Sequence, residues 1–344
     1  MHSRRRFTEL DALRGLAALA VVCLHYTSTF DTIFPHHETL PISFPYGGLG
    51  VQLFFLISGF VILMTARRRT DSIEFLKARF IRLYPTYWFC LGITVLVIYG
   101  LPFPALQRPL WELVVNATMF QSFVAVRDFD GVYWSLSREL VFYFLIAASL
   151  WFFKGKLTNR FINIFTVLWA TGGVTLIALY KMTGIGLLNI VVSASVAQYA
   201  ALFGLGMVLY VKRDSGKMLP AFYPLVPLAF IAEGLMVDWV NGTIVLLIIS
   251  LFSFVTSASS VKVLQIRWLI WVGSISYPLY LLHQNIGYAV ISTTIDTVGP
   301  WLSRLIALSV ALLLAWAVHE FIEIRLTRVI NAKLNNKKSI ETLK

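Results

Sequence analysis

Long apolar segments are the feature that most constrains this chain of 344 residues. Apolar residues make up 58% of the sequence and charged residues only 13%, whereas a soluble domain is roughly half apolar and a quarter charged. Segments of the length that crosses a bilayer, about 20 residues, recur along the whole chain. This composition excludes a soluble enzyme, a nucleic-acid-binding module and a disordered protein, and it predicts an all-α polytopic membrane protein.

We predict about ten transmembrane helices from these segments. They cover residues 10–30, 48–66, 83–101, 133–153, 161–180, 187–211, 220–237, 241–260, 268–292 and 302–324. Residues 1–330 would then form one integral-membrane domain, and residues 331–344 a polar cytoplasmic tail. We interpret 103–132, which includes the semi-apolar stretch 110–126, as an outer loop with an interfacial or re-entrant helix.

The positive charges predict the orientation of this bundle. The net charge is +12, and cytoplasmic loops of membrane proteins are enriched in Lys and Arg. With both termini in the cytoplasm, most of the 29 Lys and Arg residues fall on the inner side. A crossing at 103–132 would move the later ones outside. Arg14 and Arg138 fall inside the predicted spans, and Arg304, at the outer end of the last span, is counted with the outer segments.

The first span contains two ionisable residues, Arg14 and His25. At 100° per residue, their spacing places both side chains on the same face of one helix, separated by about 16 Å along its axis. Ionisable groups inside a bilayer are costly, so they mark functional sites by default. We therefore treat both residues as candidates.

Glu139 and His283 lie in the outer halves of the fourth and ninth spans. They could converge with His25 at a similar depth. A histidine with a carboxylate suits general-base catalysis, in which the carboxylate fixes the imidazole tautomer. The same groups would suit a proton relay in a transporter, and depth alone leaves both alternatives open.

Arg79 and Arg82 precede the third span. Their i, i+3 spacing places both guanidinium groups on one helical face, where they could bind phosphate or form an ordinary patch for anionic lipids. The last span ends in a charged group that we expect to pair with Arg14 or Arg325. This group consists of His319, Glu320 and Glu323.

The sequence predicts no metal site. Cys23 and Cys90 lie in apolar runs, without the spacing of metal ligands or of a disulfide framework. We interpret His36 and His37 as part of a solvated outer loop.

Six segments in order resemble the acyltransferase-3 family of bacterial integral-membrane O-acyltransferases, of the O-antigen and exopolysaccharide acetylase type. They are residues 9–26, with Arg14 and His25 in an Arg-x10-His arrangement; residues 50–60; residues 79–85, with an Arg-x-x-Arg arrangement; residues 134–143; residues 274–283; and Glu320 with Glu323 and Arg325. Each segment alone is short. Their order over nearly the whole chain makes the resemblance specific.

The resemblance implies transfer of an acyl group, acetyl in most members, from cytoplasmic acyl-CoA to a hydroxyl of a cell-surface or lipid-linked glycan. Some members modify small molecules such as macrolides, which is the alternative acceptor class. The expected location is the bacterial inner membrane, among membrane lipids and with no nucleic-acid partner; a homo-oligomer remains open. Acetyl-CoA is the expected co-substrate, and no metal is expected. The rival is a polytopic transporter or exporter, but this sequence lacks the matching halves typical of one.

The resemblance also implies roles for the candidates. His25 would act as the base or as a transient acyl carrier, and Glu139 would orient or charge-stabilise it. Arg14, the third catalytic candidate, would bind the pantetheine arm or hold the first span in place. Arg138 stands where many relatives have an apolar residue, and its role is open. The expected acyl-CoA-binding residues are Arg14, Arg79, Arg82 and Tyr87.

Overall fold

The computed structural model describes residues 7–35, 37–101, 106–326 and 328–329. Within these ranges the chain is helical and contains no strand, so the predicted all-α class is confirmed there. The elements are α1 (Thr8–Leu24), η1 (His25–Thr29), α2 (Phe30–Ile33), η2 (Pro45–Leu49), α3 (Gly50–Ala66), α4 (Ser72–Gly100), α5 (Leu110–Asn116), η4 (Gln121–Phe123), η5 (Gly131–Tyr133), α6 (Trp134–Phe152), α7 (Asn159–Thr183), α8 (Gly186–Ala194), η6 (Ala197–Tyr199), α9 (Ala200–Ser215), α10 (Phe222–Met236), α11 (Trp239–Ser257), η7 (Lys262–Gln265), α12 (Arg267–Ser274), α13 (Ser276–Val318) and η8 (His319–Ile324).

Among the described residues, seven continuous helical runs are long and apolar enough to cross a membrane. They are Thr8–Ile33, Pro45–Ala66, Ser72–Gly100, Gly131–Phe152, Asn159–Thr183, Trp239–Ser257 and Ser276–Ile324. The bent pair Gly186–Ala194 and Ala197–Ser215 raises the number to eight if it forms one span, and α10 is a shorter apolar helix. The chain is therefore built as a multi-pass helical membrane protein.

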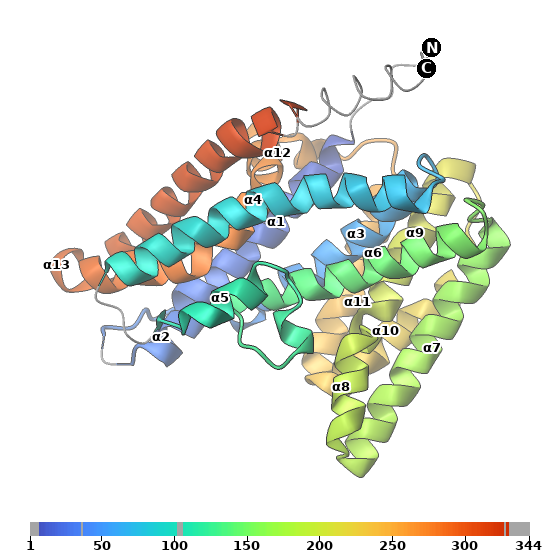
Figure 1. The fold of residues 1–344 in the computed structure, drawn as a ribbon, viewed down its shortest axis with the longest axis horizontal. Coiled ribbons are helices and arrows are strands. Elements are labelled where there is room, and N and C mark those ends of the chain that lie inside the picture. The colour runs from blue at the N-terminus through green and yellow to red at the C-terminus, as the bar shows by residue number, and fades with distance from the viewer. Residues whose placement is uncertain (1–6, 36, 102–105, 327, 330–344) are drawn as a thin grey trace.

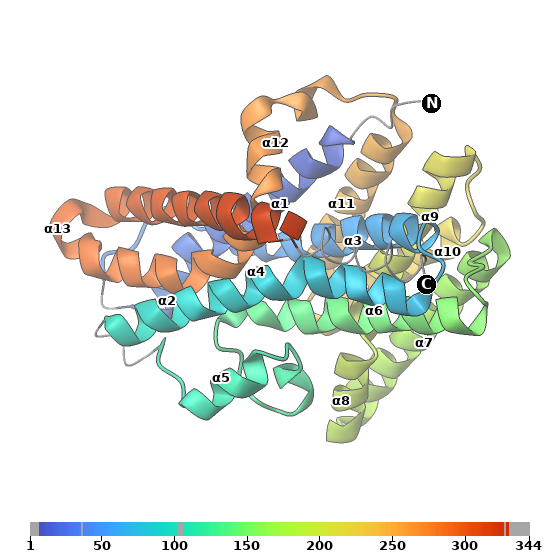
Figure 2. The ribbon, with the colours of Figure 1, turned by 45° about the horizontal axis from the view of Figure 1, so that its top comes forward.

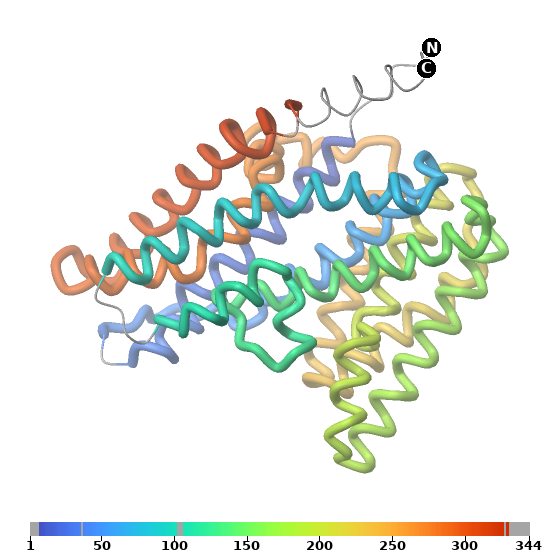
Figure 3. Tube along the Cα trace, in the orientation of Figure 1, coloured from blue at the N-terminus to red at the C-terminus, as the bar shows by residue number. Residues whose placement is uncertain are grey.

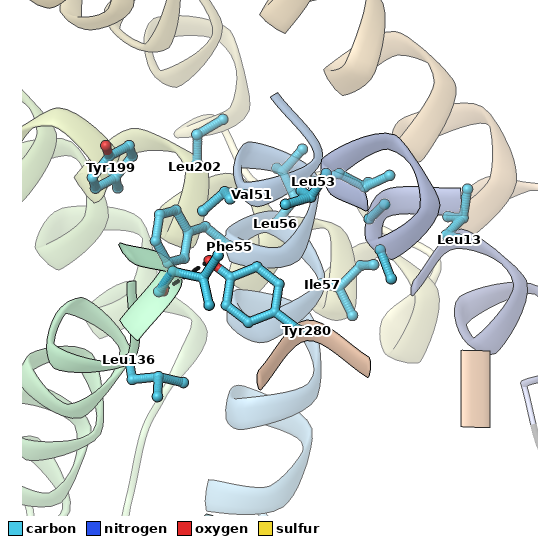
Figure 4. Packing of buried hydrophobic residues seen from close by; sticks show 14 of the residues in the cluster. Leu13, Val51, Leu53, Phe55, Leu56, Ile57, Leu136, Tyr199, Leu202 and Tyr280 are labelled. Carbon is cyan, nitrogen blue, oxygen red and sulfur yellow. Dashed lines mark hydrogen bonds between the residues drawn. The ribbon is translucent and has the colours of Figure 1, made fainter. Parts of the chain in front are cut away.

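Two groups of helices meet around a central pair. Figures 1 and 2 show α1, α4 and α13 in one group and α7 to α11 in the other, with α3 and α6 between them. The apolar window of α3 is 78% buried inside the protein. Side chains of α3 lie between Leu13 of α1 on one side and Tyr199 and Leu202 on the other (Figure 4). Helix α3 thus lies at the centre of the fold, with most of its surface covered by other helices.

Two glycines allow α3 and α9 to pack closely. A Cβ on Gly59 would lie 2.1 Å from the carbonyl oxygen of Phe203, and one on Gly206 would lie 2.1 Å from that of Leu56. Small residues let membrane helices approach backbone to backbone. The Ser58–Gly59 step in the second predicted span therefore serves packing.

The helix α13 is divided at Gly299. This residue has φ 78°, ψ 172° inside a stretch of 43 residues, a conformation that glycine adopts without a steric penalty, and Pro300 follows it. Figure 3 shows the chain reversing its direction here, so that the two limbs of α13 run side by side. This division separates the last two predicted spans.

The predicted span 268–292 is wrong as a single helix. The chain leaves helical geometry at Ile275, between α12 and α13. The cause is the packing of α12 against α1: a Cβ on Gly273 would lie 1.8 Å from the carbonyl oxygen of Asp11. Hydrophobicity continues through the break because α12 and the start of α13 are both apolar, which is why the sequence does not show it.

The third span begins earlier than predicted, at Ser72. Asp71 caps α4 by accepting a hydrogen bond from the backbone N–H of Glu74 at 2.7 Å. Arg79 and Arg82 therefore belong to the same long helix as the third predicted span.

In the segment 106–132, α5 has only 7 residues, far fewer than the roughly 20 needed to cross a bilayer. This agrees with the prediction of a helix that does not span.

Candidate active site

A cavity of about 130 Å³, partly open to solvent, lies between α1, α3, α4, α6 and α13. Its polar wall includes Arg14 from α1, Arg79 and Arg82 from α4, and Glu139 and Tyr143 from α6. We call it the arginine cavity. The fold thus brings four of the sequence-predicted residues together from three helices.

The charged groups of the arginine cavity have different partners. Arg14 lies 3.8 Å from Asp11 on its own helix. Glu323 pairs with Arg82 at 2.9 Å, so the expected pairing of the last span with Arg14 or Arg325 is wrong. The reason is that the second limb of α13 returns beside α4 (Figure 2), which brings its inner end to Arg82.

The remaining polar groups of the cavity are unevenly satisfied. One oxygen of Glu139 accepts hydrogen bonds from the hydroxyls of Ser58, at 2.9 Å, and Tyr143, at 2.6 Å. The buried Nε of Arg79 has no hydrogen-bond partner within the described residues. Buried donors are nearly always paired in folded proteins. An unpaired guanidinium N–H on a cavity wall therefore indicates a place for an anionic ligand.

His25 and His283 form a hydrogen-bonded pair beyond the far end of this cavity. The Nε2 of His283 lies 3.0 Å from the Nδ1 of His25. The Nδ1 of His283 lies 2.9 Å from the carbonyl oxygen of Tyr280 and 3.1 Å from that of Leu279. Since carbonyls only accept, this Nδ1 donates, and the Nε2 of the neutral His283 ring must accept.

The acceptor on His283 determines the tautomer of His25. The Nδ1 of His25 donates to the Nε2 of His283 and to the carbonyl oxygen of Val21, which lies 2.9 Å away. The Nε2 of a neutral His25 then keeps its lone pair free. His25 is partly exposed, whereas His283 is fully buried. This arrangement gives His25 the form that a general base requires.

The structure corrects the expected partnership of His25 and Glu139. Within the described residues, the side chain hydrogen-bonded to His25 is His283. Glu139 lines the arginine cavity instead, and His25 is not among the lining residues. Between them lies Tyr280, whose hydroxyl is 2.8 Å from that of Ser135. Tyr280 lines the cavity and is one helical turn from His283, so α13 joins the two parts of the site.

A buried cation missed by the sequence analysis holds the histidine pair. Arg304 is 6% exposed, forms an ion pair with Asp31 and donates from Nε to the carbonyl oxygen of Tyr26 at 2.7 Å. The hydroxyl of Tyr26 in turn donates to the carbonyl oxygen of His283 at 2.8 Å. The segment around Tyr26 is π-helical, as is frequent at functional sites. No spacing in the sequence links Arg304 to this segment.

Asp130 fixes the other side of His283. Its carboxylate is fully buried and accepts hydrogen bonds from the backbone N–H groups of Asn285, at 3.1 Å, and Val132, at 3.3 Å. Burial raises the pKa of Asp130 to about 7. Its position before a helical segment is typical of an N-cap, which is a signal that the sequence carries. Its bond to Asn285 is visible only in the structure.

Two further residues lie apart from the arginine cavity. Tyr87, expected to contact an acyl donor, is fully buried and does not line this cavity. Its hydroxyl donates to the carbonyl oxygen of Asn116 at 2.7 Å, which places it in the packing of α4 against the end of α5. Arg138 lines a second cavity, between α6, α8 and α10.

The described residues contain no group of three or more His, Cys, Asp or Glu side chains placed to hold a metal ion. Cys23 and Cys90 are free thiols. His37 lies 3.4 Å from Asp296, and His36 is outside the described residues.

A helical membrane bundle with an arginine-lined cavity and a buried histidine pair is typical of a membrane enzyme, and the comparisons with known proteins specify the class. The family model described as an acyltransferase domain matches residues 7–320. The chain therefore belongs to the acyltransferase-3 family, as its six segments predicted. No solved structure matches the chain.

Three curated proteins show the range of its relatives. The chain is 31% identical to acyltransferase MdmB of Streptomyces mycarofaciens, over 43% of this chain and 39% of that protein. It is 32% identical to the exopolysaccharide production protein ExoZ of Rhizobium meliloti, over 33% and 36%. It is 28% identical to the peptidoglycan O-acetyltransferase OatA of Listeria monocytogenes, over 49% and 29%. The matched segments thus span less than half the length of these relatives.

Proposed function

We propose that this protein transfers an acyl group, acetyl in the first instance, from acyl-CoA to a hydroxyl of a cell-surface or lipid-linked glycan. Family membership supports acyl transfer, and the names of two relatives refer to exopolysaccharide and peptidoglycan. The observation that carries the proposal is that the arginine cavity is lined by Tyr280, one helical turn from a histidine pair with a free Nε2 on His25 among the described residues.

We further propose ten spans with both termini in the cytoplasm of a bacterial cell. This proposal counts the seven candidate helices, the bent pair and α10, with α13 counted as two spans because it is divided at Gly299. The charge distribution supports the orientation. Residues 1–330 would form the membrane domain; the tail 331–344 lies outside the described residues. Arg79 and Arg82 then face the cytoplasm. An alkaline phosphatase fused to the C-terminus should be inactive, and an active periplasmic fusion would refute this orientation.

In this arrangement the arginine cavity binds acyl-CoA. Arg79 and Arg82 receive the phosphates of the nucleotide, since guanidinium groups form bidentate hydrogen bonds with phosphate. The pantetheine arm extends past Arg14 and Glu139 toward Tyr280. The length of this arm is comparable to the roughly 16 Å that separates Arg14 from His25 along the helix axis. Tyr87 has no part in this binding mode, because it does not line the cavity.

The chemistry then centres on His25. Its Nε2 takes the proton of the acceptor hydroxyl, and the oxygen attacks the carbonyl carbon of the thioester. The carbon–sulfur bond breaks, and the leaving thiolate of CoA receives the proton from His25. His283 holds the Nδ1–H of His25, so Nε2 stays available. In the alternative path Nε2 itself attacks the thioester carbonyl, the carbon–sulfur bond breaks and CoA leaves as the thiolate. The acceptor hydroxyl oxygen then takes the acyl group from Nε2, whose bond to the acyl carbon breaks, and the hydroxyl proton passes to the thiolate.

The decisive experiment measures labelled acetyl transfer from acetyl-CoA to extracted cell-envelope glycan by purified protein in nanodiscs. His25→Ala should lower the rate by about 10²–10⁴-fold, the usual contribution of a general base, without loss of acetyl-CoA binding. Cys23→Ala, an exposed position on the same helix, is the matched control and should retain activity. Full transfer by His25→Ala would refute the role of His25.

The same experiment separates the enzyme from a transporter. An acyltransferase releases CoA when acceptor is added and leaves acetyl on the glycan, whereas a transporter does neither. Absence of both products with every glycan fraction, at normal protein levels, would refute the proposed function.

A further inference from the structure

A second cavity, of about 160 Å³, lies apart from the arginine cavity. Its walls come from the first turns of α6, from α8, from the segment 196–199 and from the end of α10. Most of its polar and aromatic lining has no role in the proposed reaction. The lining residues that matter here are Trp134, Arg138, Asn189, Ser193, Gln198 and Tyr199.

The backbone is broken at this cavity. The helices before and after it are bent by 49°, and Val196 at the break has φ 57°, a left-handed conformation that is strained for a β-branched residue. The break is held in place, because the indole N–H of Trp169 donates to the carbonyl oxygen of Ser195 at 3.2 Å. Broken membrane helices are a frequent feature of binding sites within membrane proteins.

Arg138 is incompletely paired at the wall of this cavity. One terminal nitrogen donates to the hydroxyl of Ser193, and the guanidinium lies 5.6 Å from the ring centre of Phe123. The other terminal nitrogen is buried and has no hydrogen-bond partner among the described residues. The part of the chain that the structure describes also contains no ion pair to Arg138. A carboxylate or phosphate group on a ligand would supply the missing acceptor.

The acids nearest to Arg138 and the cavity are already bound to amides. Asp128 accepts a hydrogen bond from Gln121 at 2.8 Å. The two oxygens of Glu233 accept from Gln52, at 3.0 Å, and from Gln198, at 3.1 Å. Among the described residues, neither carboxylate forms an ion pair with Arg138. The contact with Glu233 also orients Gln198, because the NH₂ group of Gln198 is bound to Glu233 and its carbonyl oxygen is left to accept from a ligand hydroxyl.

The rest of the lining fits a polyhydroxylated ring. Asn189 is exposed and offers both a donor and an acceptor. The rings of Trp134 and Tyr199, with centroids 5.8 Å apart, provide apolar faces with polar tips. An oxyanion acceptor site beside hydroxyl-binding amides and aromatic faces matches one ligand class best, a sugar that carries an acidic group.

The second cavity lies at the level of the histidine pair. Tyr133, adjacent to Trp134, donates to the carbonyl oxygen of Leu281 at 3.3 Å, two residues before His283. Phe55 separates the two cavities: it lines the arginine cavity and its ring lies 4.6 Å from that of Tyr199 (Figure 4). A glycan bound here therefore lies close to the proposed reaction centre.

We propose that the second cavity binds an acidic sugar unit of the acceptor glycan, with Arg138 receiving its oxyanion and Asn189 and Gln198 its hydroxyls. This inference rests on the proposed function and names the acceptor class that this protein would select. Arg138 is then a specificity-determining residue, which holds the acceptor without taking part in the chemistry.

The test compares glucuronic acid with glucose, which differ only by a carboxylate in place of a hydroxymethyl group. Binding is measured by tryptophan fluorescence on the full-length protein in phosphatidylcholine nanodiscs. The wild type should bind glucuronate at least about tenfold more tightly than glucose, the usual worth of a charge-assisted hydrogen bond. Arg138→Gln should abolish this preference and leave glucose binding unchanged. Arg127→Gln, which alters an exposed cation on the loop before α6, is the matched control and should bind as the wild type does.

A second variant tests the hydroxyl-binding part of the site independently of Arg138. Asn189→Leu, at an exposed position, should weaken both sugars to the same extent. The proposal is overturned if neither sugar binds, or if glucuronate binds Arg138→Gln as it binds the wild type. It is also overturned if phosphatidylglycerol nanodiscs abolish glucuronate binding to the wild type, because the site would then hold a lipid headgroup. Acetyl transfer by a protein that binds no uronate would leave the proposed function intact and remove this inference alone.

Discussion

The arginine cavity and the histidine pair differ in how completely their polar groups are bonded. In the arginine cavity the Nε of Arg79 has no partner among the described residues. At the histidine pair the ring nitrogens of His283 and the Nδ1 of His25 all have partners, and the Nε2 of His25 is the one ring nitrogen of the pair without a partner in the described part of the chain. Unpaired groups indicate where a ligand binds, and bonded groups indicate where an atom must be held in position.

The two cations of this comparison show the same contrast. Arg82 is 48% exposed and pairs with Glu323 at the cavity wall, so it can turn toward an incoming phosphate. Arg304 is 6% exposed and its partner Asp31 only 18%, so neither is free to exchange partners. At the arginine cavity the cation can therefore change partners, whereas at the histidine pair the cation is held in place.

The largest effect is expected at Arg304. Arg304→Met leaves the partly buried Asp31 without its ion-pair partner, which costs up to about 3–5 kcal/mol, the value for a fully buried pair. Thermal unfolding in detergent should show a large loss of stability. The double variant with Asp31→Asn removes both charges and should recover much of it. Unfolding of Arg304→Met at the wild-type temperature would contradict the view that this end is held rigid.

The next effect tests the receptive end. Arg79→Gln removes a donor that the described structure leaves unpaired, so the KM for acetyl-CoA should rise by about 10–100-fold, the worth of a charge-assisted hydrogen bond, while kcat is retained. Initial rates at varied acetyl-CoA measure this. Arg69→Gln, an exposed cation on the preceding loop, should change neither constant. A fall in kcat at constant KM would show that Arg79 does not bind the donor in the ground state.

A smaller effect is expected at His283. His283→Ala removes one acceptor for the Nδ1–H of His25, but the carbonyl oxygen of Val21 remains, so kcat should fall by only about tenfold. His283→Gln, whose amide oxygen can accept, should recover part of this loss. Single-turnover rates provide the measurement. A loss in His283→Ala as large as that in His25→Ala would mean that His283 takes a direct part in the chemistry.

The smallest effect concerns pH. Burial raises the pKa of Asp130 from 3.8 to about 7, so the folded protein favours its protonated form. The stability that this provides is complete below the unfolded pKa and is lost as pH rises through 7, by about 1 kcal/mol between pH 6 and pH 8. Asp130→Asn should remove this component, seen as a flatter dependence of unfolding temperature on pH. Parallel curves for the two proteins would exclude Asp130 as the source.

Much of the fold and half of the site follow from the sequence alone. The apolar segments determine a multi-pass helical protein, because about 20 residues without charge can be satisfied only inside a bilayer. Arg14, Arg79, Arg82 and Glu139 were identified as ionisable residues in or beside apolar helices, and the fold brings them to one cavity. These features can be predicted from the sequence because each depends on a property of a single helix, its length, its charge or its face.

The remainder was decided by the tertiary structure. His25 and His283 are 258 residues apart, and Arg304 reaches Tyr26 across 278. Glu139 instead faces the arginine cavity, although it was predicted at the same depth as His25. Depth is a property of one helix, whereas contact depends on how helices cross and rotate, which is set by packing at positions such as Gly59 and Gly273. The sequence by itself determined the membrane bundle and its charged residues; only the crossing of the helices decided which of them form the base and which the binding site.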